Sequence, residues 1–115
     1  MSRTYYYKTV SGNIPVKEFL EKLSNSQLSK VLRILKAIEN NSVQNSFPFT
    51  KKLSGTKLWE IRILGKDNIR LIHAIIYHKD ILLLHGFFKK KQKTPIKDLN
   101  ISLNRYRDWI TRNGS

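Results

Sequence analysis

The sequence predicts one α+β domain spanning residues 1–115, with its elements in the order β-α-α-β-β-β-α. Two observations lead to this fold class. Three apolar segments, 58–64, 69–78 and 81–88, are separated only by short polar turns, which is typical of an antiparallel meander. Residues with helical spacing lie before and after the meander. We therefore expect an antiparallel sheet with a helical hairpin on one face, together with a C-terminal helix.

The N-terminal part of the chain predicts one strand and then the two helices of the hairpin. Residues 3–9 are rich in tyrosine and threonine, which favour strands. Pro15 suits the first turn of a helix, and Asn25 lies in a polar break that can cap the next one. The second helix has an apolar stripe formed by Leu28, Val31, Leu32, Leu35 and Ile38. We interpret this stripe as core, and we expect residues 40–50 to form a loop.

The last helix is predicted to follow a Thr-Pro pair. Thr94 can cap this helix, Pro95 suits its first position, and Gly114 suits its end. The expected apolar face consists of Ile96, Leu99, Leu103, Tyr106 and Ile110. Because most basic residues of this segment lie off that face, the helix is amphipathic.

The chain is strongly basic and lacks cysteine. Its 22 Lys and Arg residues and 8 Asp and Glu residues give a formal charge of +14. This charge favours a polyanionic partner such as nucleic acid, although a solvated basic surface or attachment to an anionic membrane would give the same composition. The lack of cysteine excludes a disulfide framework and a thiolate metal site. No apolar run approaches the roughly 18 residues that span a bilayer, and no signal peptide is apparent, so we expect a cytoplasmic protein without membrane contact.

Strand alternation places several charges on one side of the predicted sheet. Glu60 and Arg62 share one face of their strand, and Trp59 lies on the other. Arg70 on the next strand can join them if the strands pair as a meander. A carboxylate surrounded by cations suits a phosphodiester. The alternative is a set of cross-strand ion pairs on a solvated face, which contribute only about 0–1 kcal/mol.

Several motifs resemble a known family. The segment Leu-Trp-Glu-Ile-Arg at 58–62, the later Arg70, and the run Leu-Leu-His-Gly-Phe-Phe-Lys-Lys at 83–90, followed by Gln-Lys-Thr-Pro, are similar to the HigB branch (phage Gp49-like) of the RelE/ParE toxin superfamily. The resemblance covers essentially the whole chain and implies a RelE-like fold. It further implies a bacterial type II toxin that cleaves mRNA in the ribosomal A site, without a metal or other cofactor, by attack of the RNA 2′-hydroxyl. The implied partners are the ribosome with its mRNA and a HigA-like antitoxin with a helix-turn-helix domain, and operator DNA is reached only through that antitoxin.

The resemblance also implies which residues carry the chemistry. The family's basic strand positions fall on Glu60, Arg62 and Arg70, and the cation after the last strand falls on Lys89 or Lys90. The proton acceptor is then Glu60 or His85, whose imidazole suits proton transfer near neutral pH. We expect the surrounding lysines to bind RNA, namely Lys51, Lys52, Lys89, Lys91 and Lys93. The chain departs from RelE-like members at residues 92–94, where it has no aromatic side chain to stack on RNA.

The three histidines have simpler interpretations as well. His73 and His85 suit satisfied core positions, while His78 precedes a predicted turn and suits the surface. No two histidines have the helical spacing of metal ligands, so we predict no metal site. Two other functions remain open from the sequence: a ParE-like inhibitor of DNA gyrase, and a basic module that binds RNA or the ribosome without catalysis.

Overall fold

The computed structural model describes residues 2–41, 49–63, 65, 68–90 and 93–114. Within them lie five strands and three helices: β1 (Thr4–Tyr6), α1 (Pro15–Glu21), α2 (Asn25–Asn41), β2 (Thr50–Lys52), β3 (Leu58–Ile63), β4 (Ile69–Ile76), β5 (Asp80–Phe88) and α3 (Ile96–Asn113). The strands form one sheet in the order β1-β5-β4-β3-β2. The predicted α+β class is confirmed.

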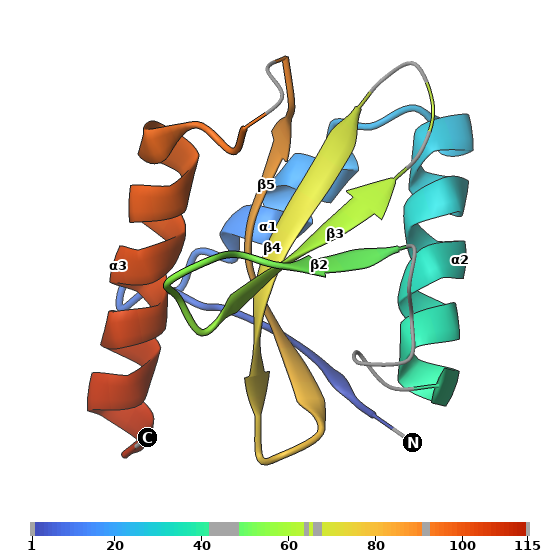
Figure 1. Cartoon of the computed structure of the whole chain (residues 1–115). Helices are drawn as coiled ribbons and strands as arrows, with labels where there is room; N and C mark the ends of the chain where they lie inside the picture. The colour runs from blue at the N-terminus through green and yellow to red at the C-terminus, as the bar shows by residue number, and fades with distance from the viewer. Residues whose placement is uncertain (1, 42–48, 64, 66–67, 91–92, 115) are drawn as a thin grey trace.

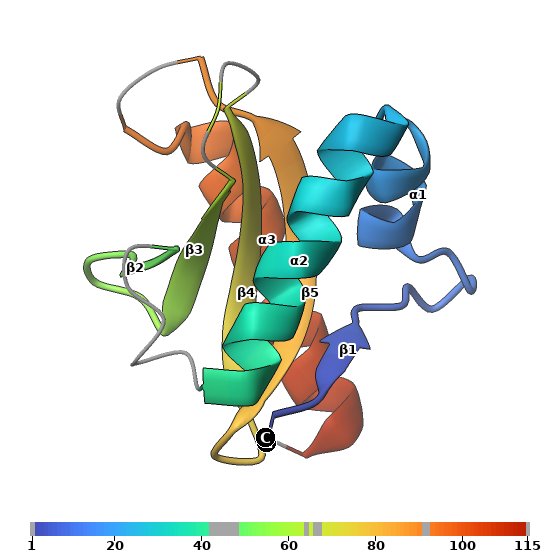
Figure 2. The same ribbon diagram turned by 90° about the vertical axis from the view of Figure 1, so that its right-hand side faces the viewer.

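The sheet lies between helices on both faces (Figures 1 and 2). Helices α1 and α2 cover one face, where their apolar residues pack with side chains such as Ile61, Leu71 and Leu83. Helix α3 covers part of the other face, over side chains such as Leu58 and Ile72. The alternation that the sequence predicts for β3 and β4 is therefore confirmed, with one apolar cluster on each side of the sheet.

Two predictions about the sheet are wrong. It is mixed rather than antiparallel, because β1 runs parallel to β5. It also contains β2, a strand that the sequence does not predict. Lys51 of β2 is paired with Glu60 of β3. The connection between β2 and β3 is closed by local hydrogen bonds, since the Thr56 hydroxyl donates to the Leu53 carbonyl and accepts the amide of Leu58. A strand of three residues is too short to show a period of two.

The turn between β4 and β5 lies two residues earlier than predicted. Tyr77 and His78 have φ values of 52° and 71°, and β5 already begins at Asp80. A positive φ is unfavourable for these residue types, but the Tyr77 ring makes edge contacts with Tyr5 and Trp109. The Asp80 carboxylate accepts the amide of the residue that precedes β1, which aligns β1 with β5.

Helix α3 differs from its prediction at its start. Pro95 is the N-cap residue, and the helix begins at Ile96, whose side chain is 75% exposed rather than packed. Of the predicted face, Leu99, Leu103 and Tyr106 do pack against the sheet, and Trp109 joins them. In α2, four of the five stripe residues are buried or partly buried as expected, whereas Leu32 is 49% exposed.

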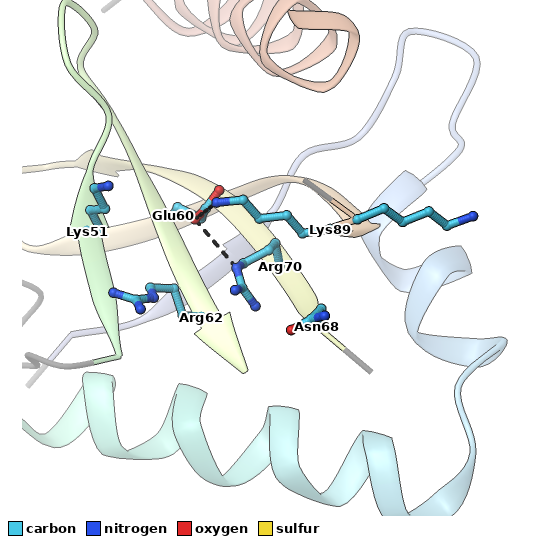
Figure 3. A pocket seen from close by; sticks show the side chains of 7 residues that line it. Lys51, Glu60, Arg62, Asn68, Arg70 and Lys89 are labelled. Atoms are coloured by element: carbon cyan, nitrogen blue, oxygen red, sulfur yellow. Dashed lines mark hydrogen bonds and ion pairs between the residues drawn. The ribbon is translucent and has the colours of Figure 1, made fainter. Parts of the chain in front are cut away.

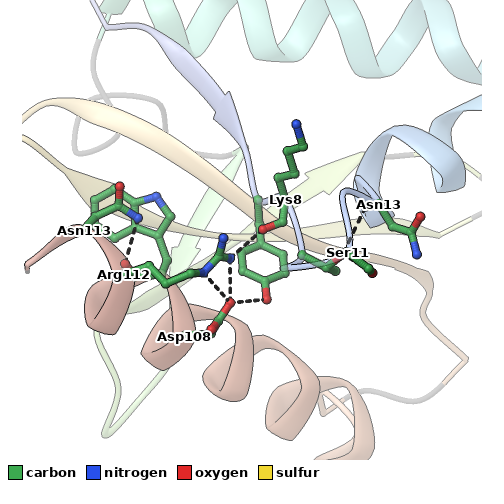
Figure 4. A network of polar contacts seen from close by, with 9 residues as sticks. Lys8, Ser11, Asn13, Asp108, Arg112 and Asn113 are labelled. Atoms are coloured by element: carbon green, nitrogen blue, oxygen red, sulfur yellow. Dashed lines mark hydrogen bonds and ion pairs between the residues drawn. The ribbon is translucent and has the colours of Figure 1, made fainter.

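The other end of α3 is tied to the segment after β1. Asp108 accepts hydrogen bonds of 2.6 Å from both Tyr7 and Arg112, and Arg112 also donates to the carbonyl of Lys8 (Figure 4). These contacts hold α3 on the sheet face and leave the sheet end near Arg62 and Arg70 uncovered. In the described part of the chain, no helix has the length and hydropathy needed to cross a membrane.

Candidate functional site

A cavity of about 390 Å³ opens where α3 leaves the sheet uncovered. Its lining comes from β2, β3, the start of β4 with the residue before it, and the segment after β5: Lys51, Glu60, Arg62, Asn68, Arg70, Lys89 and Lys90 (Figure 3). Strand register brings these residues together, since Lys51 is opposite Glu60 and Arg62 is opposite Arg70. The structure thus gathers four of the five predicted catalytic residues, Glu60, Arg62, Arg70 and Lys90.

Glu60 forms the floor of this cavity. Its side chain is 1% exposed, and its Oε1 atom lies 3.4 Å from Lys89 Nζ and 3.6 Å from Arg70 Nε. The other carboxylate oxygen accepts a hydrogen bond of 2.7 Å from the Thr94 hydroxyl. The sequence interpretation placed Glu60 on an exposed sheet face, which is wrong. A carboxylate at this depth requires charged and hydrogen-bonding partners, and these three side chains supply them.

Two arginines face each other across β3 and β4. Arg62 and Arg70 are direct cross-strand neighbours on the face that carries Glu60. Burial lowers the pKa of Arg70, the Glu60 carboxylate opposes that shift, and the charge of Arg62 adds to it. An arginine remains charged nonetheless, and like charges directly opposite on a sheet repel. An anion bound between the two guanidinium groups would relieve this repulsion.

A second cavity of about 420 Å³ lies next to the first. It shares Lys51, Glu60 and Lys89 with the first cavity and extends toward the start of α3. Its remaining lining residues are Lys52, Leu53, Ser54, Lys93, Thr94 and Leu99. We refer to the first as the phosphate cavity, to the second as the side cavity, and to both together as the basic groove.

The predicted RNA-binding lysines fall along this groove where they are described. Lys51 and Lys89 line both cavities, while Lys52 and Lys93 line the side cavity. Lys91 lies outside the described residues. Asn68 and Thr94 line these cavities as well, although neither was predicted as a site residue. Asn68 has a φ of 51°. The sequence feature that could have predicted Asn68 as a site residue is its position in a polar turn just before the strand that carries Arg70.

His85 lies in a different cluster. Its Nε2 atom is 2.7 Å from Asp98 Oδ1, and Arg105 donates to its Nδ1 atom over 3.4 Å. Burial lowers the pKa of His85, and the hydrogen bond to Asp98 partly opposes this shift. Both ring nitrogens are engaged in the neutral ring, with Nε2 donating. Ile72 separates His85 from Glu60 in the strand register, which corresponds to about 10 Å for two strand spacings.

The other histidines have the predicted locations. His78 is exposed in the turn before β5, and His73 is fully buried in the sheet. The core interpretation of His73 is right, but neither ring nitrogen has a well-formed hydrogen bond to the described residues. Burial lowers its pKa to about 4, with slight opposition from the backbone of Ala74. Among the described residues, no three His, Asp or Glu side chains gather closely enough to hold a metal ion.

The fold and the groove define a small basic α+β protein with a cationic cavity on one face of its sheet. The family model described as phage-derived protein Gp49-like matches residues 18–107, which include the end of α1, all of α2, both arginines of the groove and most of α3. The chain therefore belongs to the Gp49-like family, a toxin-like family of phage origin and of the HigB/RelE type. Curated proteins gave no match to this chain.

Proposed function

We propose that this protein is the toxin of a type II toxin–antitoxin system and cleaves mRNA on the ribosome. The observation that carries the proposal is the facing pair Arg62 and Arg70 beside the buried Glu60, with three lysines around them. Five cations around one cavity match a polyanion, and the cavity suits a single phosphodiester. The resemblance of the chain to the HigB branch supports the choice of RNA as the substrate.

The reaction requires no group beyond the RNA and the side chains of the groove. The 2′-hydroxyl oxygen bonds to the adjacent phosphorus, and the bond from phosphorus to the 5′-oxygen breaks. The products are a 2′,3′-cyclic phosphate and a 5′-hydroxyl end. Arg62 and Arg70 stabilise the charge that develops on the non-bridging oxygens, which is the kind of interaction that contributes most to such reactions. A lysine after β5, Lys89 or Lys90, donates the proton to the leaving oxygen.

We assign Glu60, rather than His85, as the proton acceptor. Glu60 is the only carboxylate among the described residues that line the groove, and His85 lines neither cavity. Both nitrogens of His85 also have partners already. The Glu60 carboxylate contacts Arg70 and Lys89, so it positions these cations as well. Removing a positioned proton acceptor typically slows a reaction about 10²- to 10⁴-fold.

The test is cleavage of a defined mRNA by the purified protein, with and without ribosomes, mapped by primer extension. The wild-type protein should cut within the reading frame only when ribosomes are present. Arg70→Ala should lower the rate about 10²- to 10³-fold. Glu60→Gln should also lose activity. Arg33→Ala removes the same charge as Arg70→Ala from an exposed position of α2 and should cut like the wild type.

Other results would exclude this function. Full cleavage by a folded Arg70→Ala variant contradicts the role of the arginine pair. Intact transcripts together with DNA damage in expressing cells would identify a gyrase inhibitor. Ribosomes that pause at codons without any cut would identify a binding module.

We further propose a HigA-like antitoxin as the partner, with operator DNA bound only through its helix-turn-helix domain. The strong positive charge of the groove supports a partner segment with acidic residues. Co-expression with the product of the neighbouring gene should suppress growth arrest and give a complex that co-purifies. A complex that forms equally well with Arg62→Glu would show that the antitoxin binds away from the groove.

A further inference from the structure

We propose that the side cavity binds a nucleobase of the RNA whose phosphate lies in the phosphate cavity. This inference deepens the proposed function and rests on it for the identity of the polymer. The two cavities are adjacent, since the side chains of Lys51, Glu60 and Lys89 line both of them. A nucleotide with its phosphate between the arginines would reach past these shared side chains to place its base in the side cavity.

The walls of the side cavity have the chemistry that a nucleobase requires. Leu53 and Leu99 are partly buried, belong to the apolar cluster under α3, and supply aliphatic surface. Ser54 and Thr94 supply hydroxyl groups among the residues that line the same space. Aliphatic contacts on the faces of a base and hydroxyl contacts at its edge are the usual composition of small-ligand sites, and about 420 Å³ lies within their range of volume.

The surrounding structure holds these walls in place. Leu53 donates its amide to the carbonyl of Leu58 and accepts the Thr56 hydroxyl, which fixes the turn that carries Ser54. On the opposite side, the Thr94 hydroxyl is bonded to Glu60. The walls formed by the β2–β3 turn and by Thr94 are therefore held in place by hydrogen bonds within the protein.

This placement also accounts for the absence of an aromatic side chain at residues 92–94. Without a ring to stack on, a base must bury its faces in another way. The pair Leu53 and Leu99 provides an apolar alternative next to the same phosphate. Lys52 and Lys93 line the same cavity, where they can meet a neighbouring phosphate of the strand.

The experiment measures binding of mononucleotides to the full-length protein by isothermal titration at constant ionic strength. The ligands are adenosine 3′-monophosphate, adenosine 5′-monophosphate and inorganic phosphate. At least one nucleotide should bind tenfold or more tightly than phosphate, and the preferred isomer shows on which side of the phosphate the base lies. Equal affinity for all three ligands would overturn the proposal.

Two variants separate the cavities. We call the tighter binding of a nucleotide than of inorganic phosphate the nucleotide advantage. Ser54→Trp places a ring in the side cavity from an exposed position, so it should abolish this advantage and leave phosphate binding unchanged. Ser29→Trp, at an exposed position of α2, is the matched control and should retain the advantage. Leu99→Ala should reduce it severalfold and serves as the second test if Ser54→Trp does not fold. Retention of the full nucleotide advantage by a folded Ser54→Trp or Leu99→Ala variant would refute the base site.

Failure of the proposed function would give a different result. If transcripts stay intact but Ser54→Trp removes the nucleotide advantage, the side cavity binds a base and the nuclease assignment is wrong. If transcripts are cut and no ligand distinguishes Ser54→Trp from Ser29→Trp, the nuclease assignment stands and the base site is wrong.

Discussion

The Thr94 hydroxyl donates a hydrogen bond of 2.7 Å to the buried carboxylate of Glu60, 34 residues away in the chain. Thr94 immediately precedes the N-cap residue of α3, and Glu60 lies in the middle of β3. This bond therefore connects the start of α3 to the floor of the basic groove. The position of α3 and the geometry of Glu60, Arg70 and Lys89 depend on each other through this contact.

The first prediction concerns that bond. Thr94→Val keeps the shape of the side chain but removes the donor, so a buried carboxylate oxygen loses its partner. The free energy of unfolding should fall by about 1–3 kcal/mol, as measured by urea denaturation. Thr94→Ser should retain most of the stability. Thr111→Val, at an exposed position of α3, is the control and should change little. Equal stability of the two valine variants would show that the bond is dispensable.

The second prediction concerns Lys90, an exposed cation of the phosphate cavity. Lys90 lines this cavity, and none of the described residues is bonded to its side chain, so Lys90→Ala should weaken RNA binding without destabilising the fold. Each phosphate contact of a single strand contributes about 0.7 to the salt slope, and the variant should lose that amount. Fluorescence anisotropy with a short single-stranded RNA at several salt concentrations measures it. Lys79→Ala in the turn before β5 is the control and should keep the wild-type slope. If Lys90→Ala also keeps the wild-type slope, RNA does not bind in the phosphate cavity.

The third prediction concerns pH and His73. Its pKa is about 4 in the folded protein and about 6.5 when unfolded, so the unfolded chain binds more protons between these values. The contribution of the neutral ring to the free energy of unfolding is complete above pH 6.5 and is lost as the pH falls toward 4. At pH 5 the loss should be about 2 kcal/mol.

The measurement is urea denaturation of the wild type and His73→Leu at pH 7.5 and pH 5. The variant cannot titrate at this position, so the stability difference between the two proteins should change by about 2 kcal/mol in favour of the variant at the lower pH. A constant difference would mean that the ring is protonated while buried.

The fourth prediction concerns Gly86. A Cβ atom at this position of β5 would lie 2.5 Å from Cδ2 of Phe19 in α1, which is closer than atoms can pack. Gly86→Ala should therefore lower the free energy of unfolding by about 1–3 kcal/mol. Phe19→Leu removes the ring and should relieve the clash, so the double variant should lose less than the sum of the single losses. Additive losses would show that the contact between the ring and the strand does not limit packing.

The residue pattern predicted the fold class and the two faces of the sheet well. Alternation in β3 placed Trp59 on the face opposite Glu60, and Trp59 does pack in the cluster under α1 and α2, because the period of two follows from backbone geometry alone. The same pattern placed Glu60, Arg62 and Arg70 on one face. It failed for β2 and for the parallel pairing of β1, since a short strand has too few residues for a period and its partner is distant in sequence.

The site was predicted in part. Charge and resemblance identified four residues that line the phosphate cavity. The suitability of an imidazole for proton transfer also pointed to His85, which the structure places beside Asp98 instead. Thr94 was expected to cap α3, whereas its hydroxyl is bonded to Glu60. A local motif shows which bonds a side chain can make, and it does not show which distant partner competes for it.

The sequence by itself determined a basic α+β domain, its two apolar faces, and a strand face carrying one carboxylate and two arginines, because these depend on composition and on short-range periodicity. Only the tertiary structure decided that Glu60 is buried, that Thr94 and Lys89 are its partners, and that a side cavity lies between the β2–β3 turn and α3. The physical reason is that burial and cavity shape arise where segments distant along the chain pack together. That packing is determined by the free energy of the whole folded chain and not by any one segment.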